Sequence, residues 1–137
     1  MITLLSTRRL ASVVLIAQAL GGALFGLALG AATGLIGAQL FAGTSDGWGD
    51  LIAAIVGAII GYTIGVSLGV YLIGRRLGGR GAYWRTLIGS IVGTALVLLA
   101  AEPLHLNANA TVLQVCLIAL PPIGATFGFN VSRKARR

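Results

Sequence analysis

The stretch GAIIGYTIGVSLG, from Gly57 to Gly69, carries a glycine at every fourth position inside an uncharged apolar run. The run extends from Leu51 to Gly74, which is long enough to cross a bilayer as a helix of about 20 residues. In water, each glycine costs a helix about 1 kcal/mol relative to alanine. Glycines at this spacing therefore predict a transmembrane helix against which a neighbouring helix packs closely.

The preceding apolar segment predicts that neighbour. GALFGLALG, from Gly22 to Gly30, parallels the first nine residues of the later stretch almost position for position. We expect the two glycine stripes to form a glycine zipper in which the helices cross at about −40°. The uncharged run from Leu10 to Phe41 gives a helix of about 48 Å, against a hydrocarbon core of about 30 Å. This first helix must therefore tilt or project from the membrane.

The composition is that of an integral membrane protein. Of 137 residues, 57% are hydrophobic and 9% are charged, whereas soluble domains carry about 25% charged residues. The length predicts a single domain. We expect an all-α membrane protein with four transmembrane helices in an antiparallel bundle, over residues of about 10–41, 51–74, 86–101 and 110–131.

The last two helices have glycine steps of their own. In the fourth helix, Pro121 and Pro122 should cause a bend unless neighbouring groups bond the freed carbonyls. Asn107 or Asn109 can cap that helix. The glycines expected to pack helices together are Gly22, Gly26, Gly30, Gly34, Gly57, Gly61, Gly65, Gly69, Gly89, Gly93, Gly124 and Gly128.

Basic and acidic residues are segregated along the chain, whose net charge is +7. The acidic residues Asp46, Asp50 and Glu102 lie in the first and third connections, and the basic residues lie at the termini and in the middle connection. The positive-inside rule then predicts a bacterial inner-membrane protein with both termini cytoplasmic. This placement favours anionic lipid over nucleic acid as the partner. The residues expected to bind lipid headgroups are Arg75, Arg76, Arg80, Arg85, Arg133, Lys134, Arg136 and Arg137.

The polar residues form no recognisable catalytic or metal-binding set. None of the four expected spans contains Asp, Glu, Lys, Arg or His, which mark proton relays and ion-coupled transporters. Asp46 and Asp50 offer too few oxygen ligands for calcium, and His105 has no partner motif for a haem. Cys116 is expected to pack as a small apolar residue. We therefore predict no enzymatic activity, no metal and no cofactor.

Two further expectations concern individual positions. Gln18 and Gln39 lie near the two ends of the first helix, where their amides can reach headgroups or water. Gly78 and Gly79 should make the middle connection flexible.

Three families of small membrane proteins offer partial likenesses. The stretch from Gly21 to Leu24 (GGAL) resembles the start of the small fluoride channels, but the arginine that follows it there is missing. The paired glycine steps are similar to those of the mitochondrial inner-membrane translocases, whose characteristic charged positions are absent. Small multidrug transporters also have four helices, but they depend on a glutamate in the first helix that this chain lacks.

These observations predict a non-catalytic accessory or scaffold subunit of a larger membrane complex, because the chain offers helix-packing surface and almost no soluble mass. Electron-transfer and light-harvesting complexes are candidate hosts, and the partners would be other membrane subunits or further copies of the chain. The alternative is a self-assembling pore, a small-solute channel or a holin-like protein. The hydroxyl groups of Thr63, Ser67, Ser90 and Thr94 could line such a pore without any ionised group.

Overall fold

The computed structural model describes residues 2–43, 48–103 and 108–131, and side chains from Ser12 onward within these ranges. All regular structure there is helical, as predicted. The helices are α1 (Ile2–Phe41), α2 (Trp48–Arg76), α3 (Tyr83–Ala101) and α4 (Ala110–Val131). Several residues singled out in the sequence lie outside the described part, namely Asp46, His105, Asn107, Arg133, Lys134, Arg136 and Arg137.

All four helices are long and apolar enough to span a membrane. The candidate spans are Ser12–Phe41, Trp48–Arg76, Tyr83–Ala101 and Ala110–Val131. Large apolar side chains such as Leu24, Leu35 and Ile60 face outward along them, which lipid accommodates and water does not. The chain is therefore a multi-pass membrane protein with four candidate spans.

Three of the four helices are longer than the apolar runs that predicted them. α1 begins at Ile2 rather than near residue 10, α2 extends by a few residues at each end, and α3 begins at Tyr83. An apolar run marks the part of a helix that matches the hydrocarbon core, but arginines are good helix formers and do not end it. The bounds of α4 agree with the prediction.

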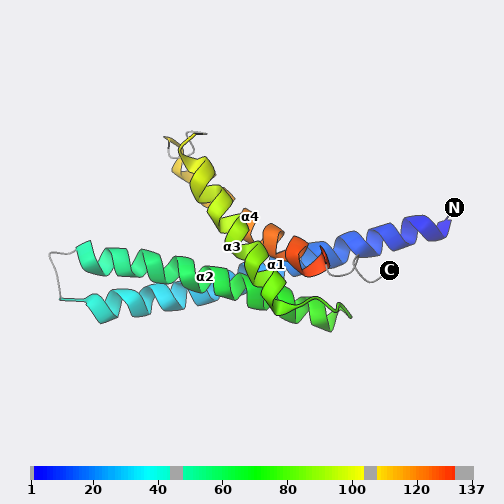
Figure 1. Ribbon diagram of the computed structural model, residues 1–137, viewed down its shortest axis with the longest axis horizontal. Coiled ribbons are helices and arrows are strands. Elements are labelled where there is room, and N and C mark those ends of the chain that lie inside the picture. Colours follow the sequence, from blue (N-terminus) through cyan, green and yellow to red (C-terminus); the bar gives the residue numbers. More distant parts are fainter. Residues whose placement is uncertain (1, 44–47, 104–107, 132–137) are drawn as a thin grey trace.

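α1 and α2 form a long antiparallel hairpin and lie side by side along the length of α2 (Figure 1). An added Cβ at Gly69 would lie 2.7 Å from the carbonyl oxygen of Gly21, and one at Gly37 would lie 2.5 Å from that of Ala53. These two contacts are about 24 Å apart along α1. Straight helices crossing at about 40° would separate well within that length, so the predicted crossing angle is wrong. Alanines of α2 lie opposite the last glycines of α1 and extend the close contact toward the C-terminal end of α1.

α3 and α4 form a second, shorter antiparallel hairpin. Added Cβ atoms at Gly89 and Gly124 would each collide with the other residue's carbonyl oxygen. α4 continues as one helix through Pro121 and Pro122, both of which are buried. The predicted bend there stays a prediction.

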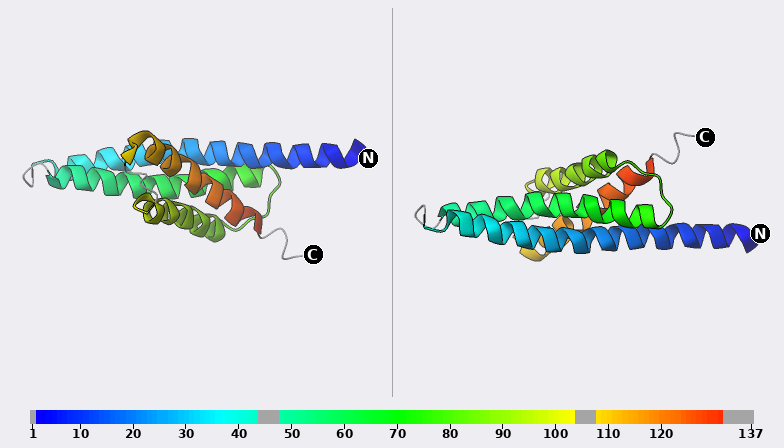
Figure 2. Two further views of the ribbon diagram at one scale, coloured as in Figure 1. Left: turned by 90° about the horizontal axis from the view of Figure 1, so that it is seen from above. Right: turned by 90° about the horizontal axis from the view of Figure 1, so that it is seen from below.

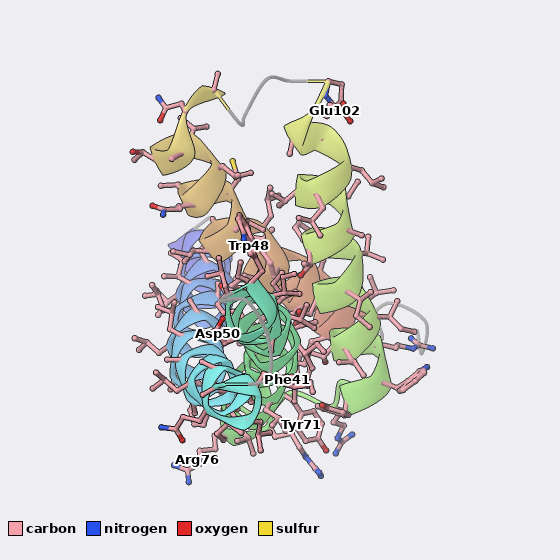
Figure 3. The ribbon with its side chains drawn as sticks, turned by 90° about the vertical axis from the view of Figure 1, so that its left-hand side faces the viewer. Phe41, Trp48, Asp50, Tyr71, Arg76 and Glu102 are labelled. Carbon is pink, nitrogen blue, oxygen red and sulfur yellow. The ribbon has the colours of Figure 1, made fainter. Side chains whose placement is uncertain are left out.

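The two hairpins meet at one end and diverge toward the other (Figures 1 and 2). The shared end holds the C-terminal parts of α2 and α4, the start of α3 and the connection between α2 and α3. The N-terminal part of α1 extends beyond it. At the diverging ends, Glu102 lies well apart from Trp48 and Asp50 (Figure 3). The bundle is thus open rather than closed around one core.

The connection from α2 to α3 begins with a defined helix cap. Gly78 has φ 79°, its N–H donates to the Arg75 carbonyl, and the N–H of Gly79 donates to the Gly74 carbonyl. This pair of bonds is a Schellman motif, which needs a left-handed residue at the position of Gly78. These two glycines therefore form a defined helix cap, and the expected flexibility of the connection stays a prediction.

The predicted cap of α4 is present at Asn109. Its side-chain oxygen accepts hydrogen bonds from the N–H groups of Thr111 at 3.1 Å and Val112 at 3.4 Å. These are two of the donors that a helix N-terminus leaves without intrahelical partners.

Candidate functional site

The seam between α1 and α2 is a contact of backbone against backbone. An added Cβ at Gly65 would lie 2.5 Å from the Phe25 carbonyl oxygen and 2.9 Å from the Cα of Gly26. The Thr33 hydroxyl lies within hydrogen-bond distance of three carbonyl oxygens, those of Leu29 at 2.8 Å and Gly30 at 3.3 Å in its own helix and that of Gly57 in α2 at 2.6 Å. A larger side chain on the α2 stripe, at Gly57, Gly61, Gly65 or Gly69, would meet backbone atoms of α1 and push the two helices apart.

The remaining glycines predicted to pack helices also face a neighbouring helix. Gly22 and Gly26 lie against side chains of α2, and Gly30 and Gly34 lie against its backbone and alanines. On the second hairpin, Gly93 lies against Leu120 and Pro121, and Gly128 lies against the Arg85 carbonyl. All the glycines predicted to pack helices have a partner-helix atom close to an added Cβ, namely Gly22, Gly26, Gly30, Gly34, Gly57, Gly61, Gly65, Gly69, Gly89, Gly93, Gly124 and Gly128. Gly21, Gly37 and Gly74, which were not predicted, share this property.

The four hydroxyl residues considered as pore lining all donate to backbone carbonyls. Thr63 donates to Ile59, Ser67 to Thr63, and Thr94 to Ser90, each one turn earlier in its own helix. Ser90 donates to the Thr63 carbonyl at 3.2 Å and so joins α3 to α2. Ser67 and Ser90 are fully buried. The Ser90 hydroxyl therefore supports a contact between helices, and the other three hydroxyls bond within their own helices.

Tyr62 compensates for a proline in another helix. Pro122 has no N–H, so the carbonyl of Ile118, four residues earlier, loses its helical donor. The Tyr62 hydroxyl donates to that carbonyl at 2.6 Å. This bond joins α2 to α4 at a point where α4 would otherwise expose an unpaired acceptor to lipid.

The shared end of the hairpins is built around Phe129. This α4 side chain is 2% exposed and lies against Gly74, Gly79 and Gly81 of α2 and the following connection. Tyr71 meets Phe129 edge to face, with ring centroids 6.4 Å apart. The three glycines leave room for the ring, so their spacing reflects packing at this end of the molecule.

Tyr71 also links this aromatic contact to the basic residues. Its ring meets Tyr83 edge to face at 5.6 Å, and its hydroxyl accepts a hydrogen bond of 2.9 Å from Arg75 Nη1. Of the residues predicted to bind headgroups, the four that the structure describes, Arg75, Arg76, Arg80 and Arg85, are all exposed. Figure 3 shows Tyr71 and Arg76 on the same side of the molecule.

Gln18 is placed differently from the prediction. It is 1% exposed, and its Oε1 accepts a hydrogen bond of 3.1 Å from Asn130 Nδ2. Asn130 also donates to the Thr126 carbonyl at 2.8 Å. The amide lies between α1 and α4 rather than in headgroups because the N-terminal part of α1 continues past it. Gln39 is exposed, as expected.

Within the described part of the chain, three open grooves lie between helices. One of 430 Å³ lies between α1 and α4, one of 470 Å³ between α2 and α3, and one of 590 Å³ along the α1 and α2 seam. Their walls are mainly aliphatic side chains. Cys116 is half-buried on α4 and lines none of the three. Within the described residues, no three His, Cys, Asp or Glu side chains gather as a metal site would require.

Sequence reasoning missed several residues that join one helix to another. Thr33, Tyr62, Phe129 and Asn130 were not singled out, although each makes a specific contact between helices. A polar residue inside an apolar span was the available signal for Tyr62 and Asn130.

Comparisons with protein-family models, curated proteins and solved structures found no match.

Proposed function

We propose that this chain is a non-catalytic accessory or scaffold subunit of a larger complex in a bacterial inner membrane. The observation that supports this proposal best is the open arrangement of two closely packed hairpins. Each hairpin uses its glycines internally, in what we interpret as glycine-zipper packing. The outer surfaces and the grooves between hairpins remain available for other membrane helices or lipids.

The polar groups support a packing role rather than a chemical one. Within the described residues, every buried side-chain nitrogen or oxygen atom has a hydrogen-bond partner. In the spans these partners are mostly backbone carbonyls of the chain itself. Such bonds hold helices in register. Electron-transfer and light-harvesting complexes are the candidate hosts that the sequence suggests.

Association is best tested by isolating the chain from its native membrane. Purification in a mild detergent followed by mass spectrometry should recover other membrane proteins in constant proportion. Ala95→Phe fills the groove between α2 and α3 and should reduce this recovery, whereas Ala119→Phe, exposed on α4 and lining none of the three grooves, should not. Recovery of the chain only as a monomer, from extracts that preserve other complexes, would contradict the proposal.

The proposed orientation places both termini and the arginine-rich end in the cytoplasm. Its support is the clustering of four exposed arginines at the shared end, whereas Asp50 and Glu102 lie at the diverging ends. Cysteines introduced at Ala82 and Ala42, both exposed, should react with a membrane-impermeant reagent from opposite sides. Labelling of both from the same side would refute this topology.

A pore is the second candidate, because Thr63 and Thr94 line the groove between α2 and α3. Several copies would have to close around this groove to form a channel. Purified protein in liposomes should not dissipate a pH gradient if the subunit proposal is correct. If the protein causes leakage, and the near-isosteric change Thr63→Val or Thr94→Val abolishes it, a pore becomes the better-supported function.

A further inference from the structure

Three exposed arginines lie where α2 ends and α3 begins. Arg75 is in the last turn of α2, Arg80 in the connection and Arg85 in the first turn of α3. Trp48–Arg76 and Tyr83–Ala101 are candidate spans, so these side chains lie where two spans leave the hydrocarbon core. We call the surface formed by Arg75, Arg80 and Arg85 the arginine end.

The backbone that carries two of these arginines is placed by contacts with α4. Gly79 and Gly81, on either side of Arg80, both lie against the Phe129 ring. At the start of α3, the Arg85 carbonyl lies against a glycine of α4. These contacts place Arg80 and Arg85 on one end of the molecule.

Tyr71 sets the direction of the third arginine. Its hydroxyl accepts a hydrogen bond of 2.9 Å from Arg75 Nη1, and its ring meets Tyr83 of α3 edge to face, with centroids 5.6 Å apart. The end of α2 and the start of α3 are joined in this way. A guanidinium group has five N–H donors, so the bond to Tyr71 leaves donors of Arg75 for an anion.

No acidic residue is described at the arginine end. The chain has three acidic residues, Asp46, Asp50 and Glu102, and the two that the structure describes lie at the diverging ends (Figure 3). Described carboxylates of the chain therefore do not neutralise the positive charge here. Guanidinium groups match the geometry of phosphate oxygens and bind them through paired hydrogen bonds.

We propose that the arginine end binds the phosphate group of an anionic phospholipid through Arg75, Arg80 and Arg85. Tyr71 positions Arg75 for this contact. The depth of these residues favours a lipid over a soluble anion, because the ends of membrane spans lie among lipid headgroups. Trp84, beside Arg85, is 67% exposed, and indole rings favour the same depth. The site does not depend on the proposed role as a subunit.

Headgroup binding can be tested on the isolated full chain by native mass spectrometry. The probes are phosphatidylglycerol and phosphatidylcholine with identical acyl chains, added to protein in detergent. The unchanged protein should retain more phosphatidylglycerol. Arg75→Gln and Arg80→Gln should each lower this preference about fivefold, the fold-change for one basic residue near an anionic lipid, and leave retention of phosphatidylcholine unchanged.

Glu102→Gln is the matched control for charge. It also changes the net charge by one, at an exposed position on a diverging end. The preference should stay that of the unchanged protein, because the arginine end is untouched. A change as large as that of Arg80→Gln would show that net charge, rather than a local site, governs lipid binding.

Tyr71→Phe tests the positioning role. It keeps the ring that meets Tyr83 and removes the oxygen that accepts the Arg75 hydrogen bond. The preference should fall, but by less than in Arg75→Gln. In the Arg75→Gln protein the same change should have no further effect, which a purely structural role would not produce. Circular dichroism and gel filtration would verify that each variant folds.

Three further results would overturn the proposal. The first is equal retention of the two phospholipids by the unchanged protein. The second is a preference that persists when Arg75 and Arg80 are both replaced, which would place the binding elsewhere. The third is tighter retention of a soluble polyglutamate peptide than of phosphatidylglycerol, which would make an acidic protein segment the occupant. None of these results bears on co-purification with other subunits, so the two proposals fail separately.

Discussion

Contacts within each hairpin and contacts between the hairpins are built differently. Within the hairpins, glycines bring backbone against backbone, as where Gly65 meets the Phe25 carbonyl and Gly89 meets Gly124. Between the hairpins, side chains reach across to carbonyls or rings. Tyr62 donates to Ile118 in this way.

The difference follows from the solvent. Lipid is as apolar as leucine, so helices gain little by hiding aliphatic side chains from it, and association relies on close packing and hydrogen bonds. A glycine stripe supplies packing over many turns at once, whereas a hydrogen bond fixes a single point. Changes in a seam should therefore disrupt a whole hairpin, and changes between the hairpins should mainly loosen their relative placement.

Gly65→Leu should have the largest effect. The new side chain would meet the Phe25 carbonyl and the Cα of Gly26, which are backbone atoms and cannot turn away. We expect a loss above the roughly 1 to 3 kcal/mol that overpacking typically costs. Gel filtration should show little monodisperse protein. Ile64→Leu, at the neighbouring outward-facing position, should behave like the unchanged protein. Similar yields for both variants would contradict close packing along this seam.

Phe129→Ala should have an intermediate effect confined to the shared end. The change removes the ring that lies against three glycines and Tyr71. Phenylalanine to alanine changes in water-soluble cores cost about 3 to 5 kcal/mol, and we expect less here because lipid can enter the space. Thermal unfolding should shift down while helix content at low temperature stays unchanged.

Phe127→Ala provides the matched control for this prediction. Phe127 lies two residues away on the same helix and is 70% exposed, so its ring contacts lipid more than protein. Its removal should shift the unfolding temperature little. Equal shifts for the two variants would show that the Phe129 contacts add nothing beyond apolar bulk.

The helices and their seams could be predicted from the sequence because both depend on periodic patterns. An uncharged run of sufficient length fixes a span, and a four-residue glycine spacing fixes which face can accept a close neighbour. The helix ends were less predictable, since arginines continue a helix beyond the apolar run. For this reason α1 begins at Ile2, well before Leu10, where the uncharged run begins.

The contacts between hairpins could not be predicted, because each depends on one residue. Gln18 lies near the end of an apolar run, where a headgroup and the Asn130 amide are equally good partners on sequence grounds. Gly78 and Gly79 suggest a flexible connection, and nothing in the sequence indicates that Gly74, Gly79 and Gly81 lie against the Phe129 ring. No spacing connects residues so far apart in the chain.

The smallest effect, and the most specific test of contacts between hairpins, is expected from Tyr62→Phe. The ring and its packing against α1 are kept, and only the hydrogen bond to the Ile118 carbonyl is lost. Hydrogen bonds between membrane helices contribute about 0.6 kcal/mol on average and up to about 1.7. We expect a loss toward the upper value, because the carbonyl has no other helical donor. Reversible unfolding in mixed micelles would measure it.

Pro122→Ala decides whether that reason is correct. Alanine restores the N–H that should bond the Ile118 carbonyl within α4, so the hydroxyl of Tyr62 would no longer be its sole donor. In a double-mutant cycle, Tyr62→Phe should then cost clearly less in the Pro122→Ala protein than in the unchanged one. Pro121→Ala is the control, because its N–H would bond the carbonyl of Leu117 and leave Ile118 as before. Additive effects of Tyr62→Phe and Pro122→Ala would show that the tyrosine stabilises the two hairpins by packing alone, as the glycine seams do.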